Sequence, residues 1–179
     1  NLLESYTPEW PIPKIFRLTK NQKLIEGVFR GETLNTPSML CVEDYLDVLK
    51  WVDSIGGYKG TIERANNNFS IIKDWVDQID WLTFLCDDDA NLSNTSVCLK
   101  FSNKLSELSE DDQRSLAKSI GKTLVDEEVA FDIVNHRNAP PGLRIWAGAT
   151  VESEDILRLL PWLDWAHQKL VNKTGDKNA

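Results

Sequence analysis

The chain has 179 residues, of which 41% are hydrophobic and 27% charged, and its formal net charge is −8 at pH 7. This composition is typical of a soluble protein with one domain and room for a piece of another. The sequence contains no cluster of Lys and Arg of the kind that binds duplex nucleic acid, and no apolar run long enough to cross a bilayer. We therefore expect no nucleic-acid or membrane partner and a cytoplasmic location.

The beginning of the chain predicts irregular structure followed by a long helix. Three prolines within residues 8–13 forbid a helix there and favour extended backbone. The helix is expected to be capped by Thr36, with Pro37 in its first turn. Apolar residues then recur close to the 3.6-residue period from Met39 to Ile55, and a glycine pair at 56–57 ends the helix.

The rest of the chain alternates between helical and extended patterns. Helices are expected over residues 61–79, from Ser109 onward and over 153–171, and strands over 81–86, 95–101, 129–134 and 143–149. This order predicts an α+β sandwich, with an antiparallel or mixed sheet covered by helices on one face. Residues 172–179 are expected to form a disordered tail.

Three places carry residue types suited to anion binding. Asn35 and Thr36 precede a helix start, where free N–H groups and the helix dipole favour phosphate, although on these residues alone an ordinary helix cap is the favoured interpretation. His136 and Arg137 lie in a loop after a predicted strand, either as a phosphate-binding pair or as a surface pair at a turn. Arg144 enters a strand, where a substrate carboxylate or a structural carboxylate of the same chain is its natural partner.

Other polar residues indicate no catalytic or metal site. The run Asp87–Asp89 lacks the pattern of a calcium loop and is expected to be a solvated turn. The three cysteines show no CxxC spacing, so neither zinc nor a disulfide framework is indicated. His167 is expected to be an exposed helix residue.

The order of several motifs resembles phosphoserine aminotransferases over nearly the whole chain. These motifs are LESYTPEWPIPKIFRLTK, FRGETLNTPSMLCVEDYL, NTSVCLKF and NHRNAPPGLRIWAGATVE. The family is a class V, fold-type I group of pyridoxal-phosphate enzymes that convert 3-phosphohydroxypyruvate and glutamate into phosphoserine and 2-oxoglutarate in serine biosynthesis. The resemblance implies a homodimer that binds a small phosphorylated substrate.

The resemblance also implies roles for the candidate residues. Asn35 and Thr36 match the pair that holds the cofactor phosphate of the other subunit. His136 and Arg137 match the pair that binds the substrate phosphate, and Arg144 matches the arginine that binds the α-carboxylate.

The matched portion is the C-terminal part of the family sequence. Residues 1–58 would be the end of the large domain with the interdomain helix, and residues 59–171 the small domain. The lysine that forms the family's Schiff base lies upstream of the matched segment, so no catalytic residue is assigned. We expect this chain alone not to hold pyridoxal phosphate covalently and to be inactive.

Two alternatives stay open on the sequence. One is a related class V aminotransferase of other specificity, against which the pair His136–Arg137 favours a phosphorylated substrate. The other is a non-enzymatic domain that self-associates through the apolar residues of its long helix.

Overall fold

The computed structural model describes residues 13–21, 23–105 and 108–175 of the chain. These residues form two compact units, which meet in sequence between Trp51 and Val52. The predicted division after residue 58, between the end of a large domain and a small domain, stays a prediction. None of the helices within the described ranges combines the length and the apolar character that a membrane crossing needs.

The first unit contains short elements and most of a long helix. Two 3-10 helices, η1 (Lys14–Phe16) and η2 (Glu26–Arg30), flank an antiparallel pair of two-residue strands, β1 (Thr19–Lys20) and β2 (Lys23–Leu24). None of the side chains described in residues 13–51 is buried. The proline-rich start of the chain lies outside the described residues up to position 12.

The helix α1 (Met39–Ser54) begins two residues later than its predicted cap requires. Ser38 caps it: its Oγ accepts a hydrogen bond from the Cys41 backbone N–H at 3.5 Å, and its carbonyl accepts one from Val42 at 3.1 Å. The prediction that Thr36 is the cap was therefore wrong. Serine and threonine cap a helix through the same kind of side-chain hydrogen bond, and serine is the more frequent cap of the two.

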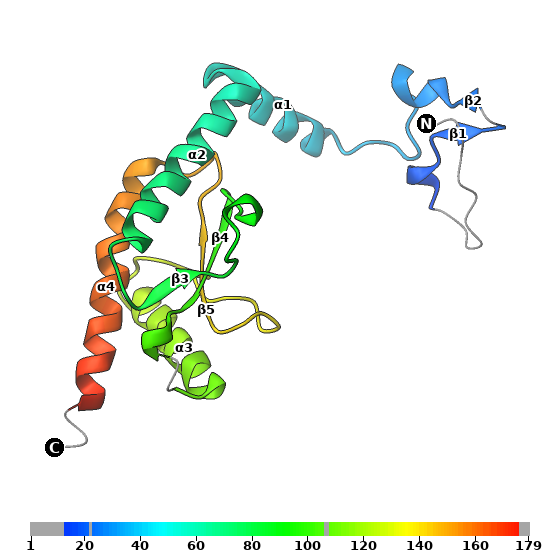
Figure 1. Ribbon diagram of the computed structural model, residues 1–179. Coiled ribbons are helices and arrows are strands. Elements are labelled where there is room, and N and C mark those ends of the chain that lie inside the picture. Colours follow the sequence, from blue (N-terminus) through cyan, green and yellow to red (C-terminus); the bar gives the residue numbers. More distant parts are fainter. Residues whose placement is uncertain (1–12, 22, 106–107, 176–179) are drawn as a thin grey trace. The chain divides into compact units, whose positions relative to one another are not determined.

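The second unit is built on a three-stranded antiparallel sheet (Figure 1). The strands β3 (Leu82–Phe84), β4 (Ser96–Phe101) and β5 (Gly142–Trp146) lie in the order β3-β4-β5. In β4, alternate residues are buried, as the period of two along a strand requires. This confirms the strand expected over residues 95–101 and places Val97, Leu99 and Phe101 on its buried face.

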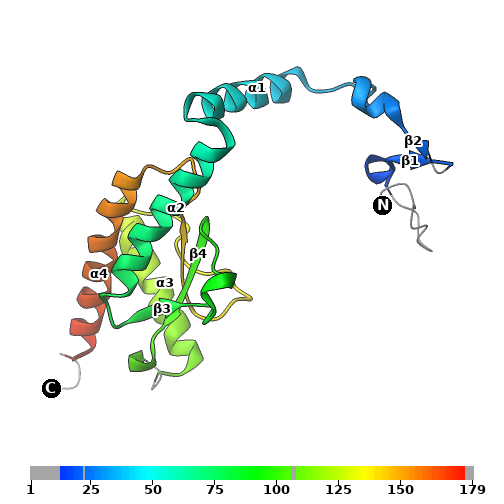
Figure 2. The same ribbon diagram turned by 45° about the horizontal axis from the view of Figure 1, so that its top comes forward.

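Three helices cover the buried face of this sheet: α2 (Gly57–Val76), α3 (Glu110–Asp126) and α4 (Ser153–Gly175). The helix α4 packs between the other two, and Figures 1 and 2 show α2 and α4 side by side. The core contains fully buried aliphatic side chains from both layers, among them Ile72, Leu99, Ile120, Leu143, Ile156 and Leu163. The expected α+β fold class is confirmed.

The start of α3 follows the sequence signal closely. Ser109 is the cap, and its Oγ accepts a hydrogen bond from the Asp112 backbone N–H at 3.2 Å while donating to the Asp112 carboxylate at 2.6 Å. Three acidic residues occupy the first turn, where the positive end of the helix dipole stabilises them. The predicted start at Ser109 is confirmed.

The strand predicted over residues 129–134 does not form. Glu128 and Asp132 have φ values of 58° and 54°, which interrupt an extended backbone. Only Val134 makes an isolated bridge, to Leu143 of β5. The segment still runs beside β5, because the Arg144 N–H donates to the Ile133 carbonyl at 2.7 Å.

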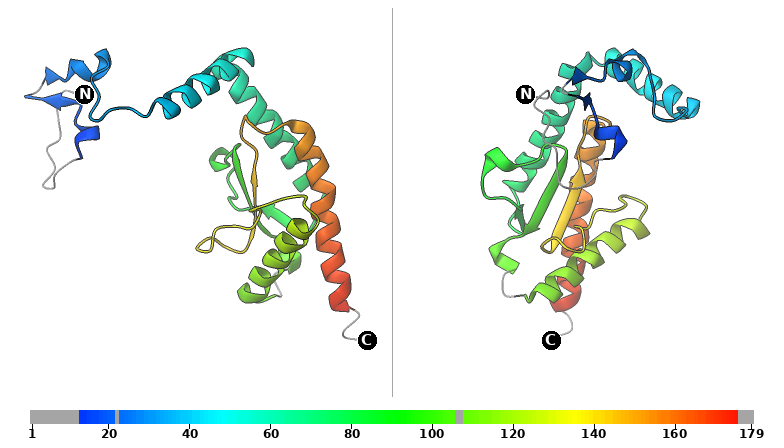
Figure 3. Two further views of the ribbon diagram at one scale, coloured as in Figure 1. Left: turned by 180° about the vertical axis from the view of Figure 1, so that it is seen from behind. Right: turned by 90° about the vertical axis from the view of Figure 1, so that its right-hand side faces the viewer.

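The helix α4 continues beyond its predicted end at Val171, through Gly175. Residues 172–175 of the predicted disordered tail are therefore helical, and residues 176–179 lie outside the described residues. Figure 3 shows the first part of α4 beside the three-stranded sheet and its last turns extending past the strands, next to α3.

A buried amide joins α2 to the loop between β5 and α4. The Asn68 side chain is fully buried, and its Nδ2 donates to the carbonyls of Ala147 at 3.2 Å and Val151 at 2.9 Å. Its Oδ1 accepts a hydrogen bond from the Ser153 hydroxyl at 2.7 Å. The carbonyls of Ala147 and Val151 thus find a partner where the loop turns against α2, as buried backbone polar groups require.

Replacing Asn68 by alanine should destabilise the second unit. The variant leaves buried carbonyls unpaired, so we expect the free energy of unfolding to fall by about 3 kcal/mol, measured by urea denaturation of the chain. The neighbouring Asn67 is exposed, and Asn67→Ala is the matched control, expected within about 0.5 kcal/mol of the parent chain. Equal effects of the two substitutions would contradict the role given to Asn68.

A histidine lies against the core rather than in solvent. The His167 ring stacks on Trp81, with ring centroids 4.2 Å apart and planes 3° from parallel, so its expected exposure was wrong. Its Nε2 is buried without a hydrogen-bond partner in the described part of the chain. Burial lowers the pKa of His167 below 6.5, against the opposing charges of Asp164 and Asp80.

This lowered pKa predicts a loss of stability in mild acid. The unfolded chain takes up a proton at position 167 that the folded chain resists, so stability is full above the unfolded pKa and falls as the pH drops through it. Urea denaturation would be measured at about pH 7 and at about pH 5. The free energy of unfolding should fall less between these pH values in His167→Phe than in the parent chain, because phenylalanine keeps a ring on Trp81 and cannot be protonated. The Asp80 carboxyl, whose pKa is lowered by Lys104, titrates below this window. An unchanged pH dependence in His167→Phe would rule out His167 as the source.

Candidate functional site

The loop that carries His136 and Arg137 is held by its own hydrogen bonds. Asn135 Nδ2 donates to the carbonyls of Leu99 and Pro140, both at 3.1 Å. The Ala139 N–H donates to the His136 carbonyl at 2.8 Å and closes a turn. Both site side chains remain exposed on this turn.

The same turn selects the tautomer of His136. The Asn138 backbone N–H donates to His136 Nδ1 at 3.3 Å. A ring nitrogen that accepts a hydrogen bond carries no proton, so the neutral ring is protonated on Nε2. His136 therefore offers an N–H donor beyond the turn in either protonation state.

Arg114, an arginine of α3, makes hydrogen bonds to the backbone of the turn that carries His136 and Arg137. Arg114 Nη1 donates to the carbonyls of Arg137 at 3.2 Å and Ala139 at 3.3 Å, and its Nη2 pairs with Glu110 at 2.8 Å. These residues border an open hollow of about 460 Å³, which the Arg137 side chain also lines. Within the described part of the chain, the Arg137 guanidinium makes no hydrogen bond or ion pair and is available to a ligand.

Arg144 lies on the sheet face opposite the core. It follows Leu143 and precedes Ile145, both buried, so the strand period turns its side chain outward. Its Nη2 forms an ion pair with Asp132 Oδ2 at 2.7 Å. Of the two partners considered for Arg144, the structure shows a carboxylate of the same chain.

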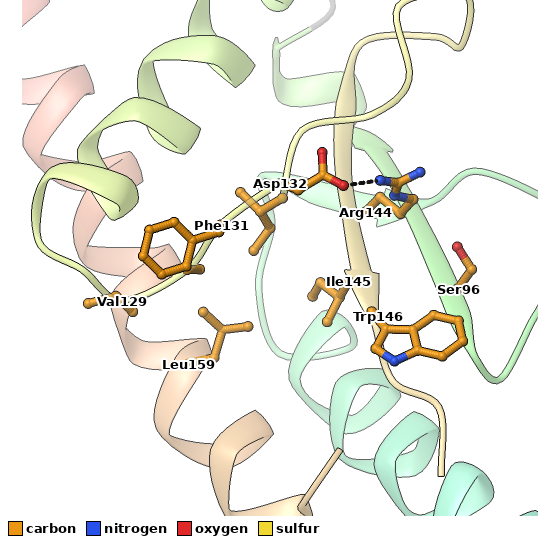
Figure 4. Close-up of a pocket in the computed structure, with 10 residues that line it drawn as sticks. Ser96, Val129, Phe131, Asp132, Arg144, Ile145, Trp146 and Leu159 are labelled. Carbon is orange, nitrogen blue, oxygen red and sulfur yellow. Dashed lines mark hydrogen bonds and ion pairs between the residues drawn. The ribbon is translucent and has the colours of Figure 1, made fainter. Parts of the chain in front are cut away.

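Arg144 and Asp132 line a hollow of about 610 Å³ (Figure 4). Figure 4 shows Phe131 and Trp146 on different sides of this pair, and both rings are exposed, by 70% and 59%. The hollow thus joins a cationic group to apolar walls. Such a combination suits a small carboxylate with a carbon skeleton.

The structure brings together only some of the predicted site residues. His136 and Arg137 share one turn, whereas Arg144 lines a separate hollow. Asn35 and Thr36 belong to the first unit, where both are exposed and precede α1. No group of three possible metal ligands lies together among the described residues.

Two residues beside the site could not be found from the sequence. Arg114 looks like one half of an i,i+4 surface pair with Glu110, and nothing in the sequence shows that its other nitrogen reaches a distant loop. Asp132 sat within the predicted strand, where its left-handed backbone was not foreseen. Its position beside Arg144 follows from that backbone conformation.

Comparison with known proteins supplies the family context. No protein-family model matches the chain. Two curated relatives named phosphoserine aminotransferase, from Methanosarcina barkeri and Methanosarcina mazei, are each 48% identical over 165 residues, which is 92% of this chain. The resemblance to phosphoserine aminotransferases is confirmed. The chain spans about two fifths of the length of these relatives, 42% in each case.

Solved structures of phosphoserine aminotransferases share the fold. The enzyme from Bacillus circulans subsp. alkalophilus matches with a TM-score of 0.64 at 24% identity, covering 79% of this chain and 36% of its own. A structure described as radiation damage of the Schiff base in phosphoserine aminotransferase matches with a TM-score of 0.65 at 16% identity, covering 84% and 39%. The names of the two curated relatives do not favour the alternatives of another specificity or a non-enzymatic domain.

The support of the turn by Arg114 is testable in the chain itself. Arg114→Met removes the donors to two carbonyls, so we expect amide exchange at Asn138 and Ala139 to accelerate about tenfold, followed by hydrogen–deuterium exchange. Arg158→Met is the matched control, because Arg158 also pairs with the residue four positions earlier, Glu154, and touches no part of the turn. Unchanged exchange in Arg114→Met would contradict this support.

Proposed function

We propose that this chain is part of a phosphoserine aminotransferase that exchanges the amino group of glutamate with 3-phosphohydroxypyruvate, yielding phosphoserine for serine biosynthesis. The observation that carries the proposal is the 48% identity with named phosphoserine aminotransferases over 92% of the chain. Pyridoxal phosphate, when bound, supplies the electron sink for amino transfer. The residues of this chain bind and orient the anionic ends of cofactor and substrate.

His136 and Arg137 are proposed to bind the substrate phosphate. Both side chains are exposed on one turn, and the hydrogen bond to His136 Nδ1 leaves its Nε2–H as a donor. A guanidinium offers two parallel N–H groups that match two phosphate oxygens. An N–H donor and a fixed positive charge on one turn favour a phosphate dianion over a neutral substrate.

Arg144 is proposed to bind the α-carboxylate. Its guanidinium stands at the edge of the hollow walled by Phe131 and Trp146, and a single exposed carboxylate engages it. Binding the two charged ends of the substrate at two loci fixes the orientation of the molecule between them, which positions its reacting carbon.

Asn35 and Thr36 are proposed to hold the cofactor phosphate of the other subunit in a homodimer. Because Ser38 caps α1, the Thr36 hydroxyl is not used by the helix. The N–H groups of Met39 and Leu40 make no hydrogen bond within the described residues. An amide, a hydroxyl and free N–H groups at the positive end of a helix fit a phosphate. We place the assembled enzyme in the cytoplasm.

A chimeric enzyme tests this proposal. This chain would replace the matching segment of the Methanosarcina barkeri relative, and transamination between phosphoserine and 2-oxoglutarate would be measured with pyridoxal phosphate present. We expect activity, and we expect Arg137→Gln to raise the KM for phosphoserine about tenfold or more, since a charged hydrogen bond is lost. Arg158→Gln, on the exposed side of α4, should leave KM and kcat unchanged.

The proposed binding of the phosphate and the α-carboxylate by different arginines gives a second measurement, the KM of each variant for each substrate. Arg144→Gln should raise the KM for phosphoserine and for 2-oxoglutarate alike, since both carry an α-carboxylate, whereas Arg137→Gln should raise the KM for phosphoserine, with its doubly charged phosphate, more than that for 2-oxoglutarate. A folded, cofactor-loaded chimera that does not accept phosphoserine would overturn the proposed function.

A further inference from the structure

Arg144 has a carboxylate partner before any substrate arrives. We propose that Asp132 occupies Arg144 in the empty site and is displaced by the incoming carboxylate, so that this residue sets the affinity of the site for carboxylates. The inference rests on the proposed function of Arg144 and adds a specificity-determining residue that the sequence did not indicate. The contact that motivates it is the ion pair of 2.7 Å between Arg144 Nη2 and Asp132 Oδ2.

The pair leaves much of the guanidinium unused. Only one nitrogen of Arg144 donates to Asp132, and the other two make no hydrogen bond within the described residues. A ligand carboxylate that approaches with both oxygens can form two parallel bonds with a guanidinium. The incoming group therefore gains a contact that Asp132 does not make.

Solvent weakens the resident pair. The Asp132 side chain is 85% exposed, whereas that of Arg144 is 36% exposed. An ion pair with one partner in water is screened and contributes little to stability. Releasing Asp132 to solvent thus costs little, and the Arg144 charge remains beside the hollow for the ligand.

The backbone holds Asp132 in place to make this contact. Asp132 has a φ of 54°, in the left-handed region that aspartate and asparagine adopt more readily than other residues with side chains. The next residue, Ile133, is fixed by the hydrogen bond of 2.7 Å that its carbonyl accepts from the Arg144 N–H. The Asp132 carboxylate is therefore held beside Arg144 by a turn that is hydrogen-bonded to β5, the strand that carries Arg144.

The surroundings favour a ligand with a carbon skeleton. Phe131, adjacent to Asp132, and Trp146, two residues beyond Arg144, expose their rings on the hollow shown in Figure 4. A carboxylate that replaces Asp132 brings its attached carbon atoms towards these rings. An inorganic anion would make no such contact.

The test measures binding of 2-oxoglutarate to the full chain without cofactor. The signals of the Arg144 Nε–H and the Trp146 indole N–H would be followed by nitrogen-15 NMR during titration. We expect Asp132→Asn, which keeps the shape and backbone preference, to bind about two- to fivefold more tightly than the parent chain. Asp132→Gly, which also tolerates the positive φ, should show the same gain.

A matched control separates displacement from a change in net charge. Asp87 forms an equally exposed pair with Lys100, at 2.9 Å and with 91% exposure of the carboxylate side chain. Asp87→Asn removes one negative charge just as Asp132→Asn does, and it should leave the affinity unchanged.

The outcomes distinguish the two proposals. Suppose that 2-oxoglutarate binding depends on Arg144 but Asp132→Asn binds it no more tightly than the parent chain. This result overturns the inference about Asp132 and leaves the proposed role of Arg144 intact. Weaker binding by Asp132→Asn would mean that Asp132 positions Arg144 for its ligand. Binding that Arg144→Gln does not reduce, in the parent chain and in Asp132→Asn, overturns the proposed role of Arg144 together with the inference.

Discussion

The pairing of β4 with β5 is the constraint on which the rest of the second unit depends. Its register places Leu99 opposite Leu143 and Val97 opposite Ile145, and all four side chains are buried against the helices. Because a strand has a period of two, the same register turns Arg144 and Trp146 to the opposite face. A shift by one residue would bury the guanidinium and expose the core, so the packing of the apolar face determines where the candidate carboxylate site lies.

The sequence predicted this part of the fold well because the relevant signals are local and strong. The alternation in β4, the Ser109 cap of α3 and the apolar period of α4 each follow from neighbouring residues. The predictions that were wrong concern features that neighbouring residues do not determine. The cap of α1 at Ser38 instead of the predicted Thr36, and the positive φ of Asp132, depend on the path of the chain rather than on the residue types alone.

The sequence predicted which residues belong to the candidate site, but not how they are arranged or which residues contact them. His136, Arg137 and Arg144 stood out because cationic side chains in loops and at strand ends need a partner, and the family resemblance gave each a role. The sequence showed neither that Arg114 supports the turn of His136 and Arg137 nor that Asp132 already pairs with Arg144. Both contacts join residues 12 or more positions apart, which no local pattern reveals.

The Asn68 amide has a consequence for how the chain tolerates changes of length. It is bonded to residues at both ends of the 147–153 connection, so an inserted residue there would separate groups that one side chain now holds together. The loop after β3 is different, since its side-chain contacts with α2 and β4 are exposed, namely the pairs Asp89–Lys73 and Asp87–Lys100 and the hydrogen bond from Asn94 to Asn66. Homologous sequences should therefore vary in length after β3 and keep a constant number of residues between β5 and α4.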